Sequence, residues 1–294
     1  MAAQAILLTG ATGNVGTTLA HRLAAQGVPF RAMVRAVNNP TAQALRALPG
    51  AEIVAGDFND PASLGRALAG IERAFLLTPS SAEAEAQQLS FVAQAQRAGV
   101  RHVVKQSQWA AAVDLPVRFL RYHAVVEKAL RTSGLAYTFL RPNLFMQGLL
   151  EFREAIADQG RFFAPIGAAG ISVVDVRDIA ALTGPGHEHH TYDLTGPAAL
   201  THAEIAAALA HALGRPVAFQ DVPPAAMLAA VRGLGMPLWM AEGLVEDYAH
   251  YHRGEATTVD PGVQQATGHA PRVFADFARD YAAAFGPAAA MPVH

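Results

Sequence analysis

Short apolar runs alternate with longer amphipathic segments through the first half of the chain. Each run ends at a turn or a polar residue, a pattern typical of parallel strands that are buried on both faces. The segments between the runs have apolar residues at helical spacing, and several close at a glycine, for example Gly27, Gly99 and Gly134. The runs predict strands at residues 6–8, 29–34, 52–55, 74–77, 102–104 and 137–140.

This alternation predicts an α/β fold with a doubly wound parallel Rossmann sheet and right-handed crossovers. The regular alternation of predicted strands and helices ends after Pro142, where Gly and Pro interrupt the apolar runs. We therefore expect a Rossmann domain at 1–142, a smaller, mostly helical lobe at 143–286 that is interleaved with it, and a loose tail at 287–294. In the lobe, the pattern predicts helices at 144–157, 203–213, 224–251 (broken at 233–237) and 272–284, with strands at 192–194 and 217–222.

Composition narrows the possible partners and compartment. The chain has 294 residues, of which 52% are hydrophobic and 16% are charged, and its formal net charge is −2. This balance predicts no nucleic-acid partner and no membrane-surface partner, because both need a clustered basic face. No apolar stretch approaches the roughly 18 residues of a membrane span, and the N-terminal segment lacks the positive charge of a signal peptide. We expect a cytoplasmic protein, and the absence of cysteine excludes thiolate chemistry. The oligomeric state stays open.

A glycine-rich loop joins the first predicted strand to the first predicted helix. Gly10, Gly13 and Gly16 have the spacing G-x-x-G-x-x-G. The first glycine allows a tight turn, the second lets a pyrophosphate approach the backbone, and the third lets the helix pack closely. The free N–H groups and the positive dipole end of the helix then favour phosphate. This context predicts a nicotinamide dinucleotide site rather than an ordinary glycine-rich turn. Its residues are Gly10, Thr12, Gly13, Asn14, Val15 and Gly16.

The end of the second predicted strand distinguishes the two nicotinamide cofactors. NAD sites place Asp or Glu there to bind the ribose 2′-hydroxyl, whereas this chain has Arg35. A guanidinium suits a 2′-phosphate, so we expect NADP, with NADPH preferred over NADH; the alternative is a solvated surface arginine. Asp57 and Phe58 are expected beside the adenine and Thr78 beside the nicotinamide ribose, unless they are only turn and strand-end residues.

Several segments together resemble one known family. They are residues 9–16, 34–35, 56–57, 133–142, 174–180 and 192–197. On these segments the chain resembles the NmrA-like, atypical short-chain dehydrogenase/reductase proteins over nearly its whole length. The resemblance implies a Rossmann fold and a nicotinamide cofactor. It also implies a choice of activities, because the family includes quinone reductases, azo-dye and triphenylmethane-dye reductases, iminium reductases, isoflavone-type reductases and redox-sensing regulators. One departure is a shorter segment between Ala180 and His187.

A second departure concerns proton transfer. Typical short-chain reductases carry Tyr-x-x-x-Lys on the helix after the fifth strand, but Tyr122 has Val126 at the fourth position after it. In register with the family, the tyrosine and lysine positions fall on Phe119 and His123. His123 is therefore the catalytic candidate, as a ribose contact or a proton relay, with Glu127 one turn further on to orient it. The alternative is a packing or surface histidine.

Two further residues come from the fifth strand. Ser107 lies where family members carry a serine that orients the substrate. Lys105 would bond the ribose if its side chain faces the cofactor, although strand alternation can turn it away. The histidine-rich run at 187–190 lies in a Gly/Pro-rich stretch without a second set of ligands, so we expect a solvated loop and no metal.

The lost tyrosine–lysine pair favours acceptors that need little acid catalysis. Quinones, azo bonds, cationic dyes and imines accept hydride with little help, whereas a ketone needs a proton donor. Aromatic and other apolar residues could wall a pocket for such an acceptor, and they are Trp109, Phe119, Phe145, Met146 and Trp239. The alternative for each is ordinary core packing. We expect an NADPH-dependent oxidoreductase of an electrophilic, conjugated small molecule. The alternatives are a non-catalytic NADP(H) redox sensor and a ketoreductase that uses His123.

Overall fold

Two units share the chain in the structure, which is a computed structural model that describes residues 6–181 and 186–286. Unit 1 consists of Met1–Pro142, Val176–Leu194 and Gly262–His269, and unit 2 of Asn143–Asp175, Thr195–Pro261 and Ala270–His294. The chain therefore returns to unit 1 twice after Pro142. The predicted loose tail at 287–294, and part of the segment between Ala180 and His187, lie outside the described residues.

A seven-stranded parallel sheet forms the centre of unit 1, as predicted. Its order is β3-β2-β1-β4-β5-β6-β9, which is that of a doubly wound sheet with one strand added at the edge. The strands are β1 (Ile6–Leu8), β2 (Phe30–Val34), β3 (Ala51–Ala55), β4 (Arg73–Leu76), β5 (His102–Gln106), β6 (Ala136–Pro142) and β9 (His190–Leu194). The last strand comes from the second half of the chain and pairs with β6 from Thr138↔His190 to Pro142↔Leu194.

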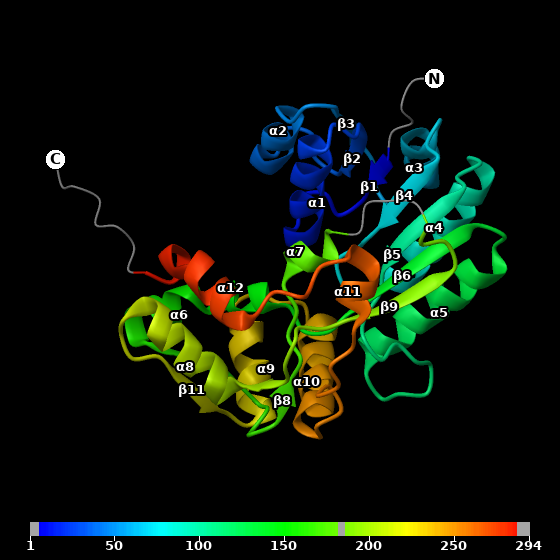
Figure 1. Ribbon diagram of the computed structural model, residues 1–294. Helices are drawn as coiled ribbons and strands as arrows, with labels where there is room; N and C mark the ends of the chain where they lie inside the picture. The colour runs from blue at the N-terminus through cyan, green and yellow to red at the C-terminus, as the bar shows by residue number, and fades with distance from the viewer. Residues whose placement is uncertain (1–5, 182–185, 287–294) are drawn as a thin grey trace. The chain divides into compact units, whose positions relative to one another are not determined.

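Helices flank this sheet and alternate with its strands (Figure 1). They are α1 (Asn14–Ala25), α2 (Pro40–Arg46), α3 (Pro61–Leu68), α4 (Ala84–Arg97), α5 (Arg118–Thr132), α7 (Val176–Ile179) and α11 (Gly262–Thr267). Helix α3 begins as its sequence predicts, because the side chain of Asp60 accepts a hydrogen bond from the N–H of Ala62 and Pro61 occupies the first turn. Helix α4 packs against both α3 and α5, whereas α1 packs against α7.

The core of unit 1 contains side chains from the sheet and from α3, α4 and α5. Leu7, Phe91 and Phe139 are fully buried in it. Burying side chains of this size contributes about 1.5–3 kcal/mol each to stability. The central strands are apolar on both faces, so covering by helices is what this sequence pattern requires.

Unit 2 has small two-stranded sheets and helices. Its elements are η1 (Met146–Phe152), α6 (Arg153–Gln159), β7 (Arg161–Ala164), β8 (Gly170–Ile171), β10 (Leu200–Thr201), α8 (His202–Leu213), β11 (Ala218–Asp221), α9 (Pro224–Gly233), α10 (Leu238–His252), α12 (Phe274–Asp280) and η2 (Ala282–Phe285). Strand β7 pairs in parallel with β11, and β8 pairs in antiparallel with β10. Helix α8 begins at a capping box, in which Thr201 and Glu204 bond each other's backbone N–H groups.

One predicted element of unit 2 is wrong. A continuous helix was expected at 144–157, but the structure has a 3₁₀ helix from Met146 followed by α6 from Arg153. The reason is that the backbone before Met146 is paired with a strand-like segment. The carbonyl of Leu144 accepts from the N–H of Val174, and the N–H of Met146 donates to the carbonyl of Val174. A helix cannot begin until that pairing ends.

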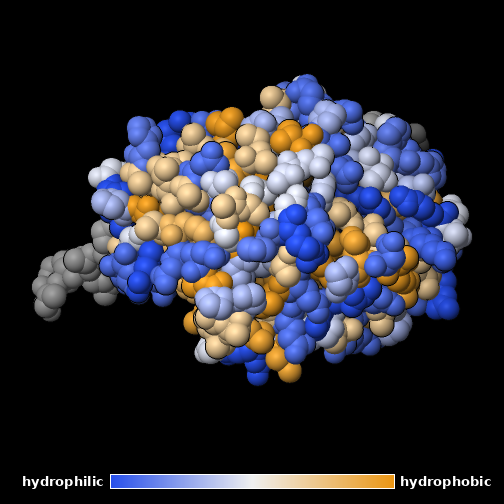
Figure 2. Space-filling model, turned by 90° about the horizontal axis from the view of Figure 1, so that it is seen from below, coloured by the Kyte–Doolittle hydropathy of each residue, from blue (hydrophilic) through white to orange (hydrophobic). Residues whose placement is uncertain are grey.

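Hydrophobic and hydrophilic side chains are mixed at the surface (Figure 2). On the face drawn in Figure 2, hydrophobic side chains lie in separate clusters between hydrophilic ones. Of the helices in the described ranges, none is long and apolar enough to cross a membrane.

Candidate functional site

The glycine-rich loop has the geometry of a phosphate cradle. Gly10 has a φ of +61°, which favours glycine, and a Cβ on Gly16 would collide with the carbonyl oxygen of Gly10. Gly16 therefore lets α1 pack directly against the turn. Thr12, Gly13 and Asn14 are exposed at the start of α1. Gly13 is the N-cap and supplies no side-chain cap, and no acidic residue lies in the first turn, so the first N–H groups remain available as donors.

A residue just before the loop ties it to the neighbouring strand. The hydroxyl of Thr9 is fully buried and lies 3.0 and 2.9 Å from the carbonyl oxygens of Phe75 and Leu77. It also accepts a hydrogen bond of 2.8 Å from the N–H of Leu77. Sequence reasoning missed this role, because threonine at the end of a strand has no distinctive pattern. Next to this tie, Thr78 is buried and its hydroxyl accepts from the amide of Gln88 at 2.7 Å.

Arg35 directly follows β2, and its side chain is exposed. Within the described part of the chain it forms no hydrogen bond or ion pair, so its guanidinium is free to bind an anion. After β3, the carboxylate of Asp57 accepts from the N–H of Asn59 at 2.8 Å and so stabilises a turn. Phe58 is half-buried, with its ring 6.0 Å from that of Phe91. The exposed helix N-terminus, the glycine cradle and the free guanidinium fit the pyrophosphate and 2′-phosphate of a dinucleotide.

A buried lysine contacts the catalytic candidate. Lys105 is fully buried on β5, and its Nζ donates to Nδ1 of His123 at 2.6 Å and to the carbonyl of Gln106 at 3.2 Å. Burial lowers the pKa of Lys105 to about 7, although the charge of Glu127 opposes the shift. Burial, the charge of Lys105 and the charge of Arg141 hold the pKa of His123 well below its usual range. At this lowered pKa the imidazole is neutral. While Lys105 is protonated, Nδ1 accepts from it and the ring proton lies on Nε2.

The alternation of strand β5 thus turns Lys105 toward α5. Lys105 on β5 and His123 on α5 come from different elements and meet in the fold. Glu127 was expected to orient His123, but the structure has Lys105 in contact with the imidazole. The carboxylate of Glu127 instead binds Ser107 and Arg141.

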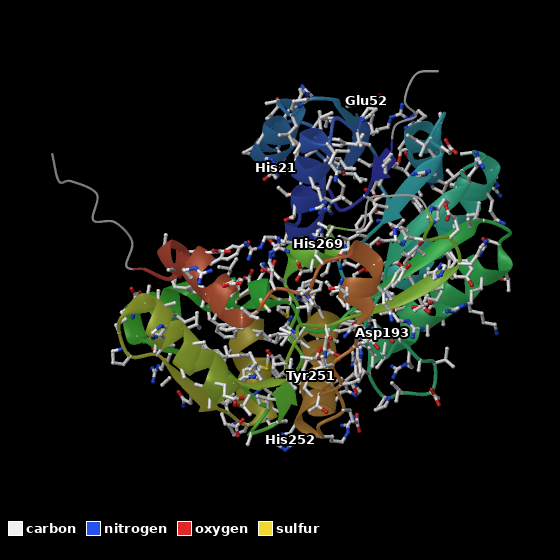
Figure 3. The ribbon with its side chains drawn as sticks, in the orientation of Figure 1. His21, Glu52, Asp193, Tyr251, His252 and His269 are labelled. Carbon is white, nitrogen blue, oxygen red and sulfur yellow. The ribbon has the colours of Figure 1, made fainter. Side chains whose placement is uncertain are left out.

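The carboxylate of Glu127 is the centre of a second buried group. It accepts from the hydroxyl of Ser107 at 2.6 Å and from Nε and Nη2 of Arg141 at 2.8 and 2.6 Å. The hydroxyl proton of Ser107 is therefore engaged in a hydrogen bond within the protein. Burial lowers the pKa of Arg141, but the hydrogen bond and charge of Glu127 and the charge of Asp193 more than offset this and raise it. Asp193 lies opposite Arg141 in the β6–β9 register (Figure 3).

Sequence reasoning also missed Arg141. The signal available was a lone cation in the apolar run before Pro142, because a charge in a buried strand needs a partner. Tyr122, which cannot form the usual pair, is also buried, and its hydroxyl lies 3.1 Å from that of Ser80. Its ring centroid is 4.1 Å from that of His123.

Two of the five predicted pocket residues line a cavity that the structure describes. Phe145 and Met146 line a cavity of about 670 Å³ in unit 2. Trp239 lies on α10 of the same unit but is not among the lining residues. Trp109 and Phe119 belong to unit 1, where Phe119 is buried on α5.

Comparisons with known proteins find relatives over nearly the whole length of the chain. The NmrA-like family model matches residues 2–278. The chain is 38% identical to an NAD(P)H azoreductase of Xenophilus azovorans over 288 residues, which cover 96% of this chain and all of the relative.

Two solved structures extend the likeness to three dimensions. The NADPH-dependent quinone oxidoreductase of Escherichia coli in complex with NADPH has a TM-score of 0.82 at 28% identity, with 94% of this chain and 99% of that chain covered. The triphenylmethane reductase of Citrobacter sp. in complex with NADP(H) has a TM-score of 0.80 at 27% identity, with 95% and 99% covered. On the family match and these relatives, the chain belongs to the NmrA-like family.

Proposed function

We propose that this protein is an NADPH-dependent reductase of an electrophilic, conjugated small molecule of the quinone, azo, cationic-dye or imine type. One observation carries the proposal: an intact glycine cradle shares unit 1 with a buried Lys105–His123 pair, while α5 carries no Tyr-x-x-x-Lys sequence. The names of the similar proteins, an azoreductase, a quinone oxidoreductase and a triphenylmethane reductase, support this substrate class.

The proposed cofactor contacts follow from the free donors of unit 1. The N–H groups at the start of α1 bind the pyrophosphate, and the guanidinium of Arg35 binds the 2′-phosphate. The bound nicotinamide supplies the hydride. Asp57, Phe58 and Thr78 complete the proposed adenosine and ribose side of the site.

The proposed proton chemistry is weak, and this restricts the acceptor. The hydroxyl of Ser107 is held by Glu127, and the imidazole of His123 is neutral. A neutral imidazole donates a hydrogen bond from Nε2 but is a poor acid, so it orients an acceptor better than it protonates an alkoxide. Lys105 acts on His123 as a positioning residue, because it fixes the ring and its tautomer. Acceptors that take their proton from water suit such a site.

Turnover with matched acceptors tests the proposal. Oxidation of NADPH is followed with a quinone, an azo dye, an imine and a ketone, for the wild type and for His123→Gln. We expect turnover with the first three classes and little with the ketone, and a change of less than about tenfold on substitution, since a general acid contributes about 100-fold or more. Ketone reduction that is abolished in His123→Gln would instead identify a ketoreductase. Tight NADPH binding without turnover of any acceptor would identify a redox sensor.

A further inference from the structure

The cavity of unit 2 has an almost wholly apolar wall. It measures about 670 Å³ and is formed by residues of η1, β7, α8, α9 and α10, among others. Its volume is that of a pocket for one small organic molecule. Polar side chains are few among the lining residues, and they are Glu151, Glu154, His202 and Tyr248.

His202 is the first of two buried polar groups on this wall. Its side chain is 3% exposed, and its Nδ1 is buried without a hydrogen-bond partner among the described residues. Its ring lies 5.9 Å from that of Phe162 and 6.4 Å from that of Tyr248. Burial lowers the pKa of His202 to about 4, although the charge of Asp221 opposes the shift, so the ring is neutral at pH 7. A buried polar atom without a partner is unfavourable, and a ligand can relieve this.

Tyr248 is the second buried polar group. It is 7% exposed, and its hydroxyl forms no hydrogen bond within the described ranges. Burial and the charge of Asp247 raise its pKa, so the hydroxyl keeps its proton and can donate. Tyr248 and His202 thus offer a donor and a tautomer-dependent donor or acceptor on one side of an apolar space.

Charge at the cavity is only negative. Glu151 and Glu154 are exposed, which places their carboxylates toward solvent at its edge, and Glu154 pairs with Arg153 at 3.5 Å. No cation stands among the lining residues, and His202 is neutral. A sulfonate or carboxylate entering this space would lose water without gaining a counter-charge.

We propose that this cavity binds an uncharged aromatic molecule that carries a hydrogen-bonding oxygen or nitrogen, with the imidazole of His202 and the hydroxyl of Tyr248 as its polar anchors. The inference rests on the proposed function where it calls this molecule the acceptor, and it narrows the acceptor to neutral quinones and azo arenes. Binding itself needs no cofactor and can be measured without turnover.

Three related probes separate the contributions of the apolar rings, the hydrogen-bonding oxygens and a negative charge to binding. They are naphthalene, naphthoquinone and naphthoquinone sulfonate. Their dissociation constants are measured by equilibrium dialysis against the full chain without cofactor. We expect naphthalene and naphthoquinone to bind, and the sulfonate to bind at least about tenfold more weakly, because it must desolvate a charge. Equal or tighter binding of the sulfonate would overturn the proposal.

Variants at the two anchors test the polar contacts. We expect His202→Phe and Tyr248→Phe each to weaken naphthoquinone binding about three- to tenfold, the range of one hydrogen bond, and to leave naphthalene binding unchanged. Naphthalene thereby reports that the cavity is still folded. His202→Gln should recover part of the loss, since its amide lies near the place of Nε2. His211→Phe is the control, because His211 lies exposed on the same helix α8.

The outcomes separate this inference from the proposed function. If both anchor variants bind naphthoquinone as the wild type does, the polar groups hold water only and the inference fails. If NADPH reduces neutral and sulfonated quinones with equal KM, the inference fails while the reductase stands. If the probes bind as expected but NADPH reduces none of them, the reductase fails while the cavity assignment stands.

Discussion

Nζ of Lys105 and Nδ1 of His123 lie 2.6 Å apart, and both side chains are buried. The two residues come from different elements, β5 and α5, and lie 18 positions apart in the sequence. The contact places an ammonium donor on a neutral imidazole in a site where neither group is well solvated. The protonation of Lys105 is therefore linked to the tautomer of His123. Because Lys105 is buried, its protonation also affects the stability of the fold.

The burial of Lys105 should make stability depend on pH. Its pKa is about 7 in the folded protein, against 10.5 for an exposed lysine. Between these values the unfolded chain binds more protons, so this residue's contribution to stability rises with pH from about 7 to 10.5 and is most unfavourable below 7. Lys105→Met removes that dependence. Urea unfolding at several pH values should show that the free energy of unfolding of the variant falls relative to that of the wild type as pH rises through this window.

Lys128→Met is the matched control, because Lys128 is exposed on α5. Its stability difference from the wild type should stay flat between pH 7 and 10. A flat difference for Lys105→Met as well would mean that the ammonium is not buried as the structure has it.

The pair of Glu127 and Arg141 should be strongly coupled. The Glu127 side chain is 2% exposed and the pair is bidentate, so removing one partner leaves a buried charge and costs about 3–5 kcal/mol. Removing both with Glu127→Leu/Arg141→Leu should cost less than the sum of the single changes. A double-mutant cycle from urea unfolding measures the coupling, which we expect at about 1–3 kcal/mol.

The cycle on Arg31 and Glu52 provides the comparison. These side chains are also 2.8 Å apart, but Glu52 is 53% exposed, so solvent screens the pair. We expect its coupling to be at most about 1 kcal/mol. Equal couplings for the two pairs would contradict the view that burial sets the strength.

Gly16→Ala should damage cofactor binding through the backbone. The added Cβ would collide with the carbonyl oxygen of Gly10, which cannot move away as a flexible side chain can. The start of α1 must shift, so NADPH affinity should fall at least about tenfold, the loss of one charge-assisted hydrogen bond or more. Isothermal titration with NADPH measures it. Gly65→Ala on α3 has no Cβ neighbour closer than 3.8 Å and should bind NADPH as the wild type does.

Arg35→Ala should change the choice between the two nicotinamide cofactors. A guanidinium on a 2′-phosphate contributes a charge-assisted hydrogen bond or a bidentate pair, so the NADPH-to-NADH affinity ratio should fall about tenfold or more. NADH binding should change little. Arg46→Ala, at the exposed end of α2, should leave the ratio as it is. An unchanged ratio in Arg35→Ala would remove this residue from the cofactor site.

The sequence alone determined the parts of this protein that depend on neighbouring residues. Alternation of apolar runs and helices predicts the parallel sheet, and the strand before Gly10 and the helix that contains Gly16 predict the phosphate loop. The exposed Arg35 follows from its place at the end of β2. Such patterns are local because the periods of strands and helices are expressed over a few residues.

Only the tertiary structure decided which distant side chains meet. The strand order places β9 beside β6, and the register of β5, β6 and α5 brings Lys105 to His123 and Glu127 to Arg141. The same is true of His202, whose sequence reads as an ordinary first residue of a helix and whose unpaired Nδ1 appears only once Phe162 and Tyr248 surround it. Hydrogen bonds and desolvation act between atoms in space, and periodicity along the chain carries no information on which partners the packing will supply.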